Sequence, residues 1–176
     1  VSFFEYEVIR TPKVTADENI DSIILNDEQQ NVFLGISELI KAGEPNASLL
    51  FGVTGSGKTS VFAKLIQYTL KLDKTVIMMI PEISLTPQMV SKFQSYFGDE
   101  VAVVHSSLSL SQRLNEYKRI KSGQAKIVVG TRSAVFSPLE NIGLVIIDEE
   151  GERTYKSESS PRYNAKEIAK KRCVTH

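Results

Sequence analysis

From residue 48 onward, short apolar runs alternate with longer stretches in which apolar residues recur at helical spacing. The short runs predict strands at 48–52, 75–80, 101–104, 126–130 and 143–147. The periodic stretches predict helices at about 58–71, 87–97 and 111–122. Short strands without a polar face that alternate with helices are typical of a parallel sheet covered on both sides. The pattern therefore predicts an α/β fold with a mostly parallel sheet.

Capping residues locate the starts of three helices. Asn26 can accept a hydrogen bond from the first helical turn, and Gln29 follows in the capping-box position. Apolar residues then recur at helical spacing until Gly43, which is a typical helix end. From these residues alone, Gln29 is read as half of a cap. Two further starts have signals of the same kind: Thr86 before Pro87, and Ser109 with Gln112.

The two ends of the chain differ from its middle. Residues 1–20 show no helical period, and Pro12 would break a strand formed by the apolar residues before it. We interpret this segment as a linker that precedes one domain over residues 21–176. The chain ends in a basic helix predicted from Ala165 to about Val174.

A glycine-rich octet joins the apolar run at 48–52 to the helix predicted at 58–71. It has the spacing G-x-x-x-x-G-K-T of a phosphate-binding P-loop, the Walker A motif. Its glycines let backbone N–H groups turn toward phosphate oxygens in front of a helix N-terminus. The lysine would reach the β- and γ-phosphates, and the threonine hydroxyl would bind Mg²⁺. The predicted nucleotide contacts are Gly52, Thr54, Gly55, Ser56, Gly57, Lys58 and Thr59.

Acidic residues follow the last predicted strand. The apolar run that ends at Ile147 continues into Asp148, Glu149 and Glu150. A strand that simply meets a polar turn would have the same local pattern. Together with a P-loop earlier in the same sheet, however, the pattern favours a Walker B motif. Asp148 would then hold Mg²⁺, and Glu149 would orient the attacking water.

Composition sets broad limits on the class of protein. The chain has 176 residues, of which 41% are hydrophobic and 24% charged, as in ordinary globular domains. Its apolar runs are too short to span a bilayer, and no signal segment opens it, so we expect a cytoplasmic protein with no membrane partner. The single cysteine, Cys173, excludes an internal disulfide and a cysteine-built zinc site in these residues.

The charge distribution is uneven although the net charge is zero. Residues 1–50 carry a net charge of −6, and residues 151–176 carry +4. In the basic part, two tyrosines lie among cationic residues in a polar loop at 151–163. Aromatic rings next to cations suit single-stranded nucleic acid, because bases stack on the rings and phosphates pair with the charges. Tyrosines that pack onto the core would give the same pattern, so both interpretations stay open at this point.

Five motifs, in this order, resemble those of superfamily 2 helicases, and more narrowly those of the bacterial primosomal replication-restart helicases. They are residues 25–29, 52–59, 81–88, 129–134 and 148–150. The sequence PEISLTPQ at 81–88 is close to diagnostic of this group. Three shorter matches agree with it: His105-Ser106 with Arg113, Thr154-Tyr155-Lys156, and Pro161-Arg162-Tyr163. The resemblance covers about residues 20–174.

The resemblance implies a RecA-like P-loop NTPase lobe, the first motor lobe of an ATP-dependent 3′-to-5′ DNA helicase. Such an enzyme uses ATP and Mg²⁺ to act on single-stranded or forked DNA during replication restart, together with other restart proteins. Gln29 would read the adenine, and Lys58, Asp148 and Glu149 would be the catalytic residues. The residues implied to contact DNA are Thr86, Thr131, Arg132, Tyr155, Lys156, Arg162 and Tyr163.

The chain departs from this family in two respects. Gly151 occupies the position after the two glutamates where the family usually has a histidine that couples the ATP site to DNA. The second lobe with its arginine finger, the N-terminal DNA-binding region and the zinc module also lie outside these residues. An arginine finger contributes about 10³–10⁵ in rate in related phosphoryl transfer, so we expect little ATPase activity from this chain alone.

Two other functional classes are compatible with a P-loop. One is a different superfamily 2 translocase, against which the sequence at 81–88 argues. The other is a non-motor nucleotide-binding module, such as a switch or a small-molecule kinase. A kinase would need an acceptor pocket and an arginine-rich lid, and the segment after the P-loop helix offers neither.

Overall fold

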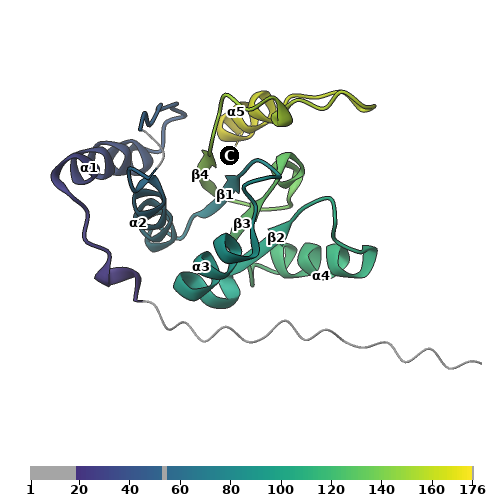
Figure 1. The fold of residues 1–176 in the computed structure, drawn as a ribbon, viewed down its shortest axis with the longest axis horizontal. Coiled ribbons are helices and arrows are strands. Elements are labelled where there is room, and N and C mark those ends of the chain that lie inside the picture. The colour runs from purple at the N-terminus through teal and green to yellow at the C-terminus, as the bar shows by residue number, and fades with distance from the viewer. Residues whose placement is uncertain (1–18, 53–54, 176) are drawn as a thin grey trace, which may run out of the picture.

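The computed structural model describes residues 19–52 and 55–175, which form a parallel sheet flanked by helices (Figure 1). The strands are β1 Thr75–Met79, β2 Val101–Val104, β3 Ile127–Gly130 and β4 Ile142–Ile147. The helices are α1 Asp27–Ala42, α2 Lys58–Lys71, α3 Pro87–Phe97, α4 Leu110–Lys121 and α5 Ala165–Thr175. Short 3₁₀ turns are η1 Ile20–Ser22, η2 Gly98–Glu100, η3 Arg132–Phe136 and η4 Arg153–Tyr155. The predicted linker, residues 1–20, lies almost entirely outside the described residues.

All four strands run parallel in the order β2-β3-β1-β4. Met79, the last residue of β1, lies opposite Gly130 of β3 and Ile147 of β4. The register therefore brings the carboxyl ends of the strands to one edge of the sheet. The predicted class, an α/β fold with a parallel sheet, is confirmed.

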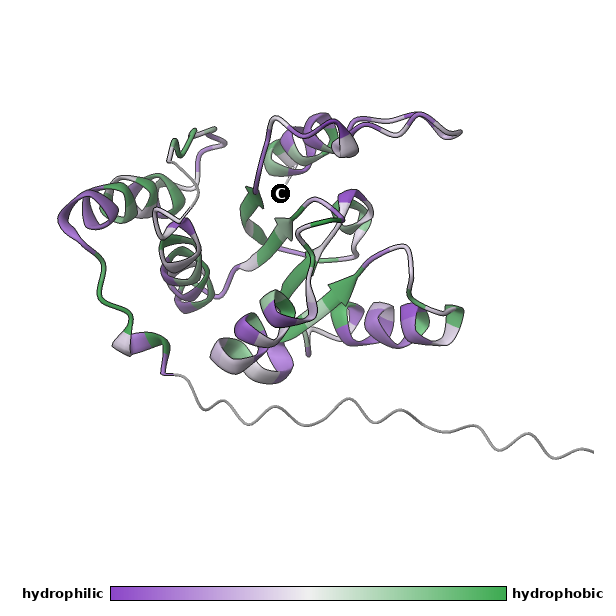
Figure 2. Ribbon diagram, in the orientation of Figure 1, coloured by the Kyte–Doolittle hydropathy of each residue, from purple (hydrophilic) through white to green (hydrophobic). Residues whose placement is uncertain are grey.

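Helices cover both faces of the sheet, and the strands have the colour of hydrophobic residues in Figure 2. Apolar side chains between the layers form the core. Ile120 of α4, Ala165 and Ala169 of α5, and residues of η3 pack on one face. Phe62 and Ile66 of α2 pack on the other face with Phe93 of α3. Helix α1 lies outside this layer and packs on α2 through Ile40, Val61 and Leu65. Side chains of β1 alternate between the two clusters, so the strand is buried on both faces as its apolar sequence predicts.

The capping signals in the sequence mark the helix starts correctly. Asn26 and Gln29 form the predicted capping box of α1, and Gly43 ends that helix in the left-handed conformation. Thr86 caps α3, in which Pro87 is the first residue. Ser109 and Gln112 form the capping box of α4. Each of these side chains satisfies a backbone N–H that has no partner within its helix, which fixes where the helix begins.

The strand predicted at 48–52 does not form, and this prediction is wrong. The segment has no strand hydrogen bonds, and the side chains of Leu49 and Phe51 are 78% and 91% exposed. Leu50 alone turns inward, between α2 and Leu144 of β4. A strand is stable only when a neighbour pairs with its backbone groups. The outer edge of β4 does not pair with this segment, so its apolar residues alone do not make it a strand.

Arg172 fastens α5 to the segment between η3 and β4. Its guanidinium nitrogens donate to the carbonyl oxygens of Val135, Ser137 and Leu139 at 2.7–2.8 Å. Ser137 and Leu139 are buried, so water has little access to these carbonyls. The arginine therefore serves as the hydrogen-bond donor that the turn needs, and it holds α5 over β4.

Substitution Arg172→Ala should lower the free energy of unfolding by about 2 kcal/mol, because it leaves buried carbonyl groups without a donor. Urea denaturation followed by circular dichroism measures this change. Lys171→Ala is the matched control, since its exposed side chain makes no hydrogen bond or ion pair within the described residues. The control should stay within about 0.5 kcal/mol of the original chain. Equal effects of the two substitutions would contradict the anchoring role.

Candidate nucleotide site and nucleic-acid face

The residues predicted to be functional gather at the carboxyl edge of the sheet. Four segments leave the strands there: 80–86 after β1, 105–109 after β2, 131–136 after β3 and 148–155 after β4. In open α/β sheets, ligands bind at this edge because the connections there are free to carry polar side chains. The P-loop leads into the N-terminal end of α2, and the C-terminal end of α2 directly precedes β1.

Gly57 holds the described part of the P-loop in a conformation that suits only glycine. It caps α2 with a φ of 79°, and a Cβ atom at this position would overlap the amide nitrogen of Gln29. The ammonium nitrogen of Lys58 donates to the carbonyl oxygen of Gly52 at 2.8 Å. This bond folds the lysine back across the loop. Thr54 lies outside the described residues.

Gln29 performs two tasks with one amide group. Its Oε1 accepts from the backbone N–H of Asn26 at 3.0 Å, which completes the capping box. Its Nε2 donates to the carbonyl oxygen of Ser56 at 2.9 Å. The interpretation of Gln29 as half of a cap is therefore correct but incomplete, because the same side chain also fixes the P-loop to the start of α1.

The acidic pair continues the pairing of β1 with β4. The backbone N–H of Asp148 donates to the carbonyl oxygen of Met79 at 2.9 Å. The Asp148 carboxylate then accepts from the backbone N–H of Glu149 at 3.0 Å. Glu149 has a φ of 47°, a left-handed conformation that is unusual for a residue with a side chain. The chain therefore turns sharply after β4, and Glu149 is exposed at the edge of the sheet.

The available oxygen donors suit a hard divalent cation such as Mg²⁺. The Thr59 hydroxyl makes no hydrogen bond to any described residue, and one oxygen of Asp148 is likewise unused. The described residues contain no group of three or more His, Cys, Asp or Glu side chains that could hold a metal ion. A cation bound by Thr59 and Asp148 would therefore need phosphate oxygens and water as further ligands, which is how Mg²⁺ is usually held.

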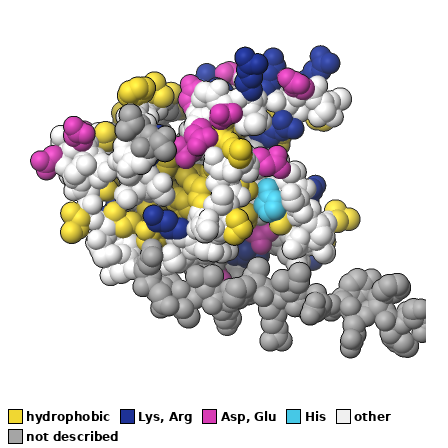
Figure 3. All heavy atoms as spheres, in the orientation of Figure 1, with side chains coloured by type: hydrophobic (Ala, Val, Ile, Leu, Met, Phe, Trp, Pro, Cys, Tyr) yellow, Lys and Arg dark blue, Asp and Glu magenta, His cyan; other side chains and the backbone are white. Residues whose placement is uncertain are grey.

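The basic C-terminal part of the chain lies along one side of this edge. Figure 3 shows Lys and Arg side chains gathered over α5 and the loop that leads to it. In that loop, Lys156 and Arg162 are exposed, and backbone bonds tie residues 156–157 to 163–164. Tyr163 is half-buried, and its ring meets the Phe136 ring edge-on at a centroid distance of 4.9 Å. The predicted cationic contacts at 156 and 162 are therefore accessible to a polyanion.

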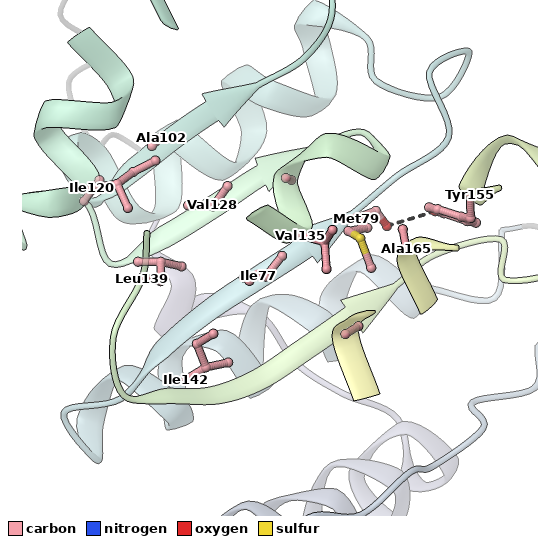
Figure 4. Close-up of a cluster of buried hydrophobic side chains, with 13 residues drawn as sticks. Ile77, Met79, Ala102, Ile120, Val128, Val135, Leu139, Ile142, Tyr155 and Ala165 are labelled. Carbon is pink, nitrogen blue, oxygen red and sulfur yellow. Dashed lines mark hydrogen bonds between the residues drawn. The ribbon is translucent and has the colours of Figure 1, made fainter. Parts of the chain in front are cut away.

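Tyr155 packs into the core, so the structure favours the second of the two interpretations of this residue. Its side chain is 1% exposed, and its hydroxyl donates to the carbonyl oxygen of Asp148 at 2.6 Å. The same hydroxyl lies 3.1 Å from the carbonyl oxygen of Met79 (Figure 4). Its ring cannot stack on a base from this position, so the expected DNA contact through Tyr155 needs correction. Burial, with the negative charges of Asp148 and Glu149, raises the pKa of the Tyr155 phenol.

Arg132 is also tied into the protein. Its Nη1 lies 3.3 Å from the carbonyl oxygen of Thr154 and 3.2 Å from that of Lys156. The arginine therefore connects η3 to the loop after β4, and only its remaining N–H groups could reach a phosphate. Thr131 beside it is buried, whereas the Thr86 hydroxyl accepts from the backbone of α3 as a cap.

A cavity of about 460 Å³ opens between the ends of β2 and β3, α4 and this loop. His105, Thr131 and Ser133 are among the polar side chains in its lining that have no hydrogen-bond partner within the described residues. Tyr117, Phe136 and Tyr163 contribute aromatic surface. The cavity thus combines free polar groups with rings, next to Arg132.

Two hydrogen bonds between loops were not predicted from the sequence. The Ser84 hydroxyl lies 3.2 and 3.3 Å from the two carboxylate oxygens of Glu149. The Ser106 hydroxyl donates to the carboxylate of Glu82, and Arg113 donates to the carbonyl oxygens of Ser106 and Leu108. Polar residues directly after the ends of strands were the available signal, but sequence does not show which of them meet.

The fold and this arrangement define a helicase motor domain. A model of the DEAD/DEAH box helicase family matches residues 25–173, and the chain belongs to that family. Membership implies nucleotide binding with a divalent metal ion. A crystal structure of a hypothetical ATP-dependent RNA helicase from Sulfolobus tokodaii shares the fold, with a TM-score of 0.55 and 23% identity. That match covers 75% of this chain and 41% of the other.

Within the family, the chain is similar to the replication restart protein PriA. It is 49% identical over 152 residues to PriA of Bacillus subtilis, which is 86% of this chain and 19% of the relative. Identity to PriA of Haemophilus influenzae is 43% over 158 residues, which is 90% of this chain and 21% of that protein. The chain therefore spans about a fifth of the length of these relatives. None of the described helices is long and apolar enough to cross a membrane.

Substitution Tyr155→Phe should keep the packing of the ring but lower the free energy of unfolding by about 1 kcal/mol, through loss of the hydrogen bond to Asp148. The difference should depend on pH. A phenol ordinarily titrates near pH 10, so above about pH 10 the unfolded chain loses this proton while the folded chain retains it. The folded state of the original chain is then destabilised as pH rises toward the raised pKa.

Urea denaturation of both chains at about pH 8 and about pH 10.5 tests this prediction. The stability advantage of the original chain over Tyr155→Phe should shrink at the higher pH. Titration of lysines affects both chains equally and cancels in the comparison. An advantage that stays constant or grows with pH would contradict the buried, protonated phenol.

Proposed function

We propose that this chain is the ATP-binding motor lobe of an ATP-dependent 3′-to-5′ DNA helicase that acts in replication restart. The observation that carries this proposal is the common edge on which the acidic pair after β4 and the connections after β1 and β3 meet. The similarity to PriA, a replication restart protein by name, supports the same biological process. Replication-restart proteins would then be partners of the longer protein.

Nucleotide binding is assigned to the two sides of the P-loop. Backbone N–H groups of Gly55 to Thr59 would face the phosphates, and Lys58 would exchange its bond to Gly52 for the β- and γ-phosphates. Gln29 is placed beside Ser56, so its amide is close to any nucleotide in this loop. An adenine contact from Gln29 would account for a preference for ATP.

Hydrolysis is assigned to the acidic pair. Thr59 and Asp148 would hold Mg²⁺, which neutralises charge that develops on the phosphates. Glu149 would accept a hydrogen bond from the attacking water and orient it. Its exposure at the edge of the sheet leaves room for such a water molecule.

DNA binding is assigned to the connections after β1 and β3 and to the loop before α5. Thr86 and Thr131 would lie along the phosphate backbone, with Lys156 and Arg162 as free cations. Tyr163 could offer one face of its ring to a base, because it is only partly buried. Tyr155 and Arg132 would act indirectly, because they hold this loop against Met79, Asp148 and η3.

A titration with a labelled single strand of DNA, with and without ATP–Mg²⁺ and at two salt concentrations, tests the function. We expect binding that weakens with salt, because cations neutralise phosphates. Arg162→Glu should lower DNA affinity about tenfold or more at low salt without changing nucleotide affinity. Lys58→Ala should do the reverse, since it removes the charge that pairs with the phosphates.

Lys41→Glu is the matched charge reversal for Arg162→Glu, because Lys41 is exposed on α1 and has no partner among the described residues. It should leave DNA affinity nearly unchanged. Binding of ATP–Mg²⁺ without any binding of DNA at low salt would favour a non-motor nucleotide-binding module. Binding of neither would refute the proposed function.

Gly151→His should fold as well as the original chain. A Cβ atom at this position meets nothing within 4 Å, and the backbone of Gly151 does not have a positive φ. The free energy of unfolding should therefore change by no more than about 0.5 kcal/mol. If the family's histidine couples ATP to DNA, the substitution should increase the effect of ATP–Mg²⁺ on DNA affinity in the titration above. A loss of stability above about 1 kcal/mol would contradict the open surroundings of this position.

A further inference from the structure

Ser84 makes the only side-chain hydrogen bond of the Glu149 carboxylate within residues 19–52 and 55–175. Its hydroxyl lies at nearly equal distances, 3.2 and 3.3 Å, from the two carboxylate oxygens. A hydroxyl has a single hydrogen, so this hydrogen is shared between both oxygens. The interaction turns both oxygens of Glu149 toward the connection after β1.

The connection that carries Ser84 is a tight, hydrogen-bonded turn. The N–H groups of Ser84 and Leu85 donate to the carbonyl oxygen of Pro81 at 2.9 and 3.1 Å. Pro81 is buried, and the N–H of Thr86 donates back to the carbonyl oxygen of Ser84 at 2.9 Å. The hydroxyl of Ser84 is therefore positioned by the turn as a unit, and it moves when the turn moves.

The same turn is linked on its other side to the cavity. Glu82 accepts from the hydroxyl of Ser106, which follows β2, and Arg113 of α4 donates to the carbonyl oxygen of Ser106. Glu82, Ser106 and Arg113 all line the cavity beside Thr131 and Arg132. A ligand that displaces any of these groups therefore acts on the turn that holds Ser84.

The backbone of Glu149 is held by hydrogen bonds, whereas among the described residues its carboxylate is held by Ser84 alone. Its left-handed φ of 47° is unfavourable for a residue with a Cβ atom. Hydrogen bonds from Glu149 to the Asp148 carboxylate and from Glu152 to Glu149 keep this conformation in place. The side chain has one polar tether, Ser84, and is otherwise exposed to solvent.

We propose that Ser84 is a positioning residue that restrains Glu149 and that nucleic acid bound at the cavity releases this restraint. This inference rests on the proposed function and specifies how its two sites communicate. With Ser84 attached, both carboxylate oxygens face the turn, and water competes with the hydroxyl for them. Movement of the turn through Glu82 and Ser106 frees one oxygen to orient the attacking water. The turn that carries Ser84 then has two states, and binding of nucleotide or of nucleic acid shifts the equilibrium between them.

Two measurements on this chain test the restraint. The first is the rate of ATP hydrolysis, with the protein in excess over ATP, with and without a 20-nucleotide single strand. The second is the ratio of the Kd values of a non-hydrolysable ATP analogue with and without this DNA. The second measurement does not need turnover, so it remains informative if the chain hydrolyses ATP slowly.

Ser84→Ala should raise the DNA-free rate about threefold or more, because loss of one hydrogen bond frees the carboxylate. The stimulation of the hydrolysis rate by DNA should fall by the same factor. The Kd of the ATP analogue should become nearly the same with and without DNA. Ser84→Thr keeps the hydroxyl and should behave like the original chain. Ser91→Ala is the matched control, since Ser91 is an exposed serine of α3 without a partner in the described structure.

Ser106→Ala cuts the network at the cavity instead of at Glu149. It should reduce the stimulation measured at saturating DNA, because movement at the cavity no longer reaches the turn that carries Ser84. This variant keeps the test decisive if Ser84→Ala fails to fold. A purely structural role of Ser84 would lower stability and all activities together, in contrast to the expected gain in the DNA-free rate.

The outcomes separate this proposal from the proposed function. Binding of both ATP–Mg²⁺ and DNA, with Ser84→Ala indistinguishable from Ser91→Ala in both measurements, would overturn the restraint and leave the motor function standing. A lower DNA-free rate in Ser84→Ala would also overturn it. Binding of neither ligand by the original chain would overturn both proposals. An increased DNA-free rate with a Kd ratio near one supports both.

Discussion

The carbonyl oxygen of Met79 is the point on which the arrangement of the site depends. It accepts from the N–H of Asp148 at 2.9 Å and lies 3.1 Å from the hydroxyl of Tyr155. One carbonyl thus joins β1, the acidic pair and the loop that carries the basic residues. A carbonyl oxygen has two lone pairs, so the Met79 oxygen can face both groups, while the single hydrogen of the Tyr155 hydroxyl is shared between Met79 and Asp148. The register of β1 and β4 therefore fixes the positions of Asp148 and Glu149 and of the start of the basic loop together.

Local signals in the sequence predicted most of the fold. The predicted helix 58–71 coincides with α2, because its apolar residues follow a strict helical spacing. Local spacing could not decide whether 48–52 forms a strand, since a strand depends on a pairing partner, and the partners in this sheet are remote in sequence. Connections between parallel strands are right-handed. Helices α2 and α3 cover the same face of the sheet, and the connection through α3 leads from β1 toward β2. A right-handed connection through α2 would therefore come to β1 from the opposite side, beyond β4, where the sheet of this structure ends.

The candidate site was predicted in its parts but not in its connections. The spacing of residues 52–59 and the acidic residues after β4 predict the chemistry of the site, because each motif is contiguous in the sequence. Burial of Tyr155 depends on how the loop returns to Met79, and the pattern of aromatic and basic residues is the same for a buried and an exposed ring. Arg132 likewise donates hydrogen bonds to the carbonyl oxygens of Thr154 and Lys156, which its sequence position does not reveal. Pairs separated by many residues, such as Ser84 and Glu149, have no local signal.

Two separate routes lead from the nucleic-acid face to the acidic pair, and they act on different atoms. The loop before α5 reaches the backbone of Asp148 through the buried hydroxyl of Tyr155. The turn after β1 reaches the carboxylate of Glu149 through Ser84. The first contact is nearly inaccessible to water and is made by a rigid ring, so it holds in place Asp148, the proposed metal ligand. The second is long, shared and exposed, so a small movement can break it. A motor needs both properties: a fixed metal ligand and a movable water-orienting group.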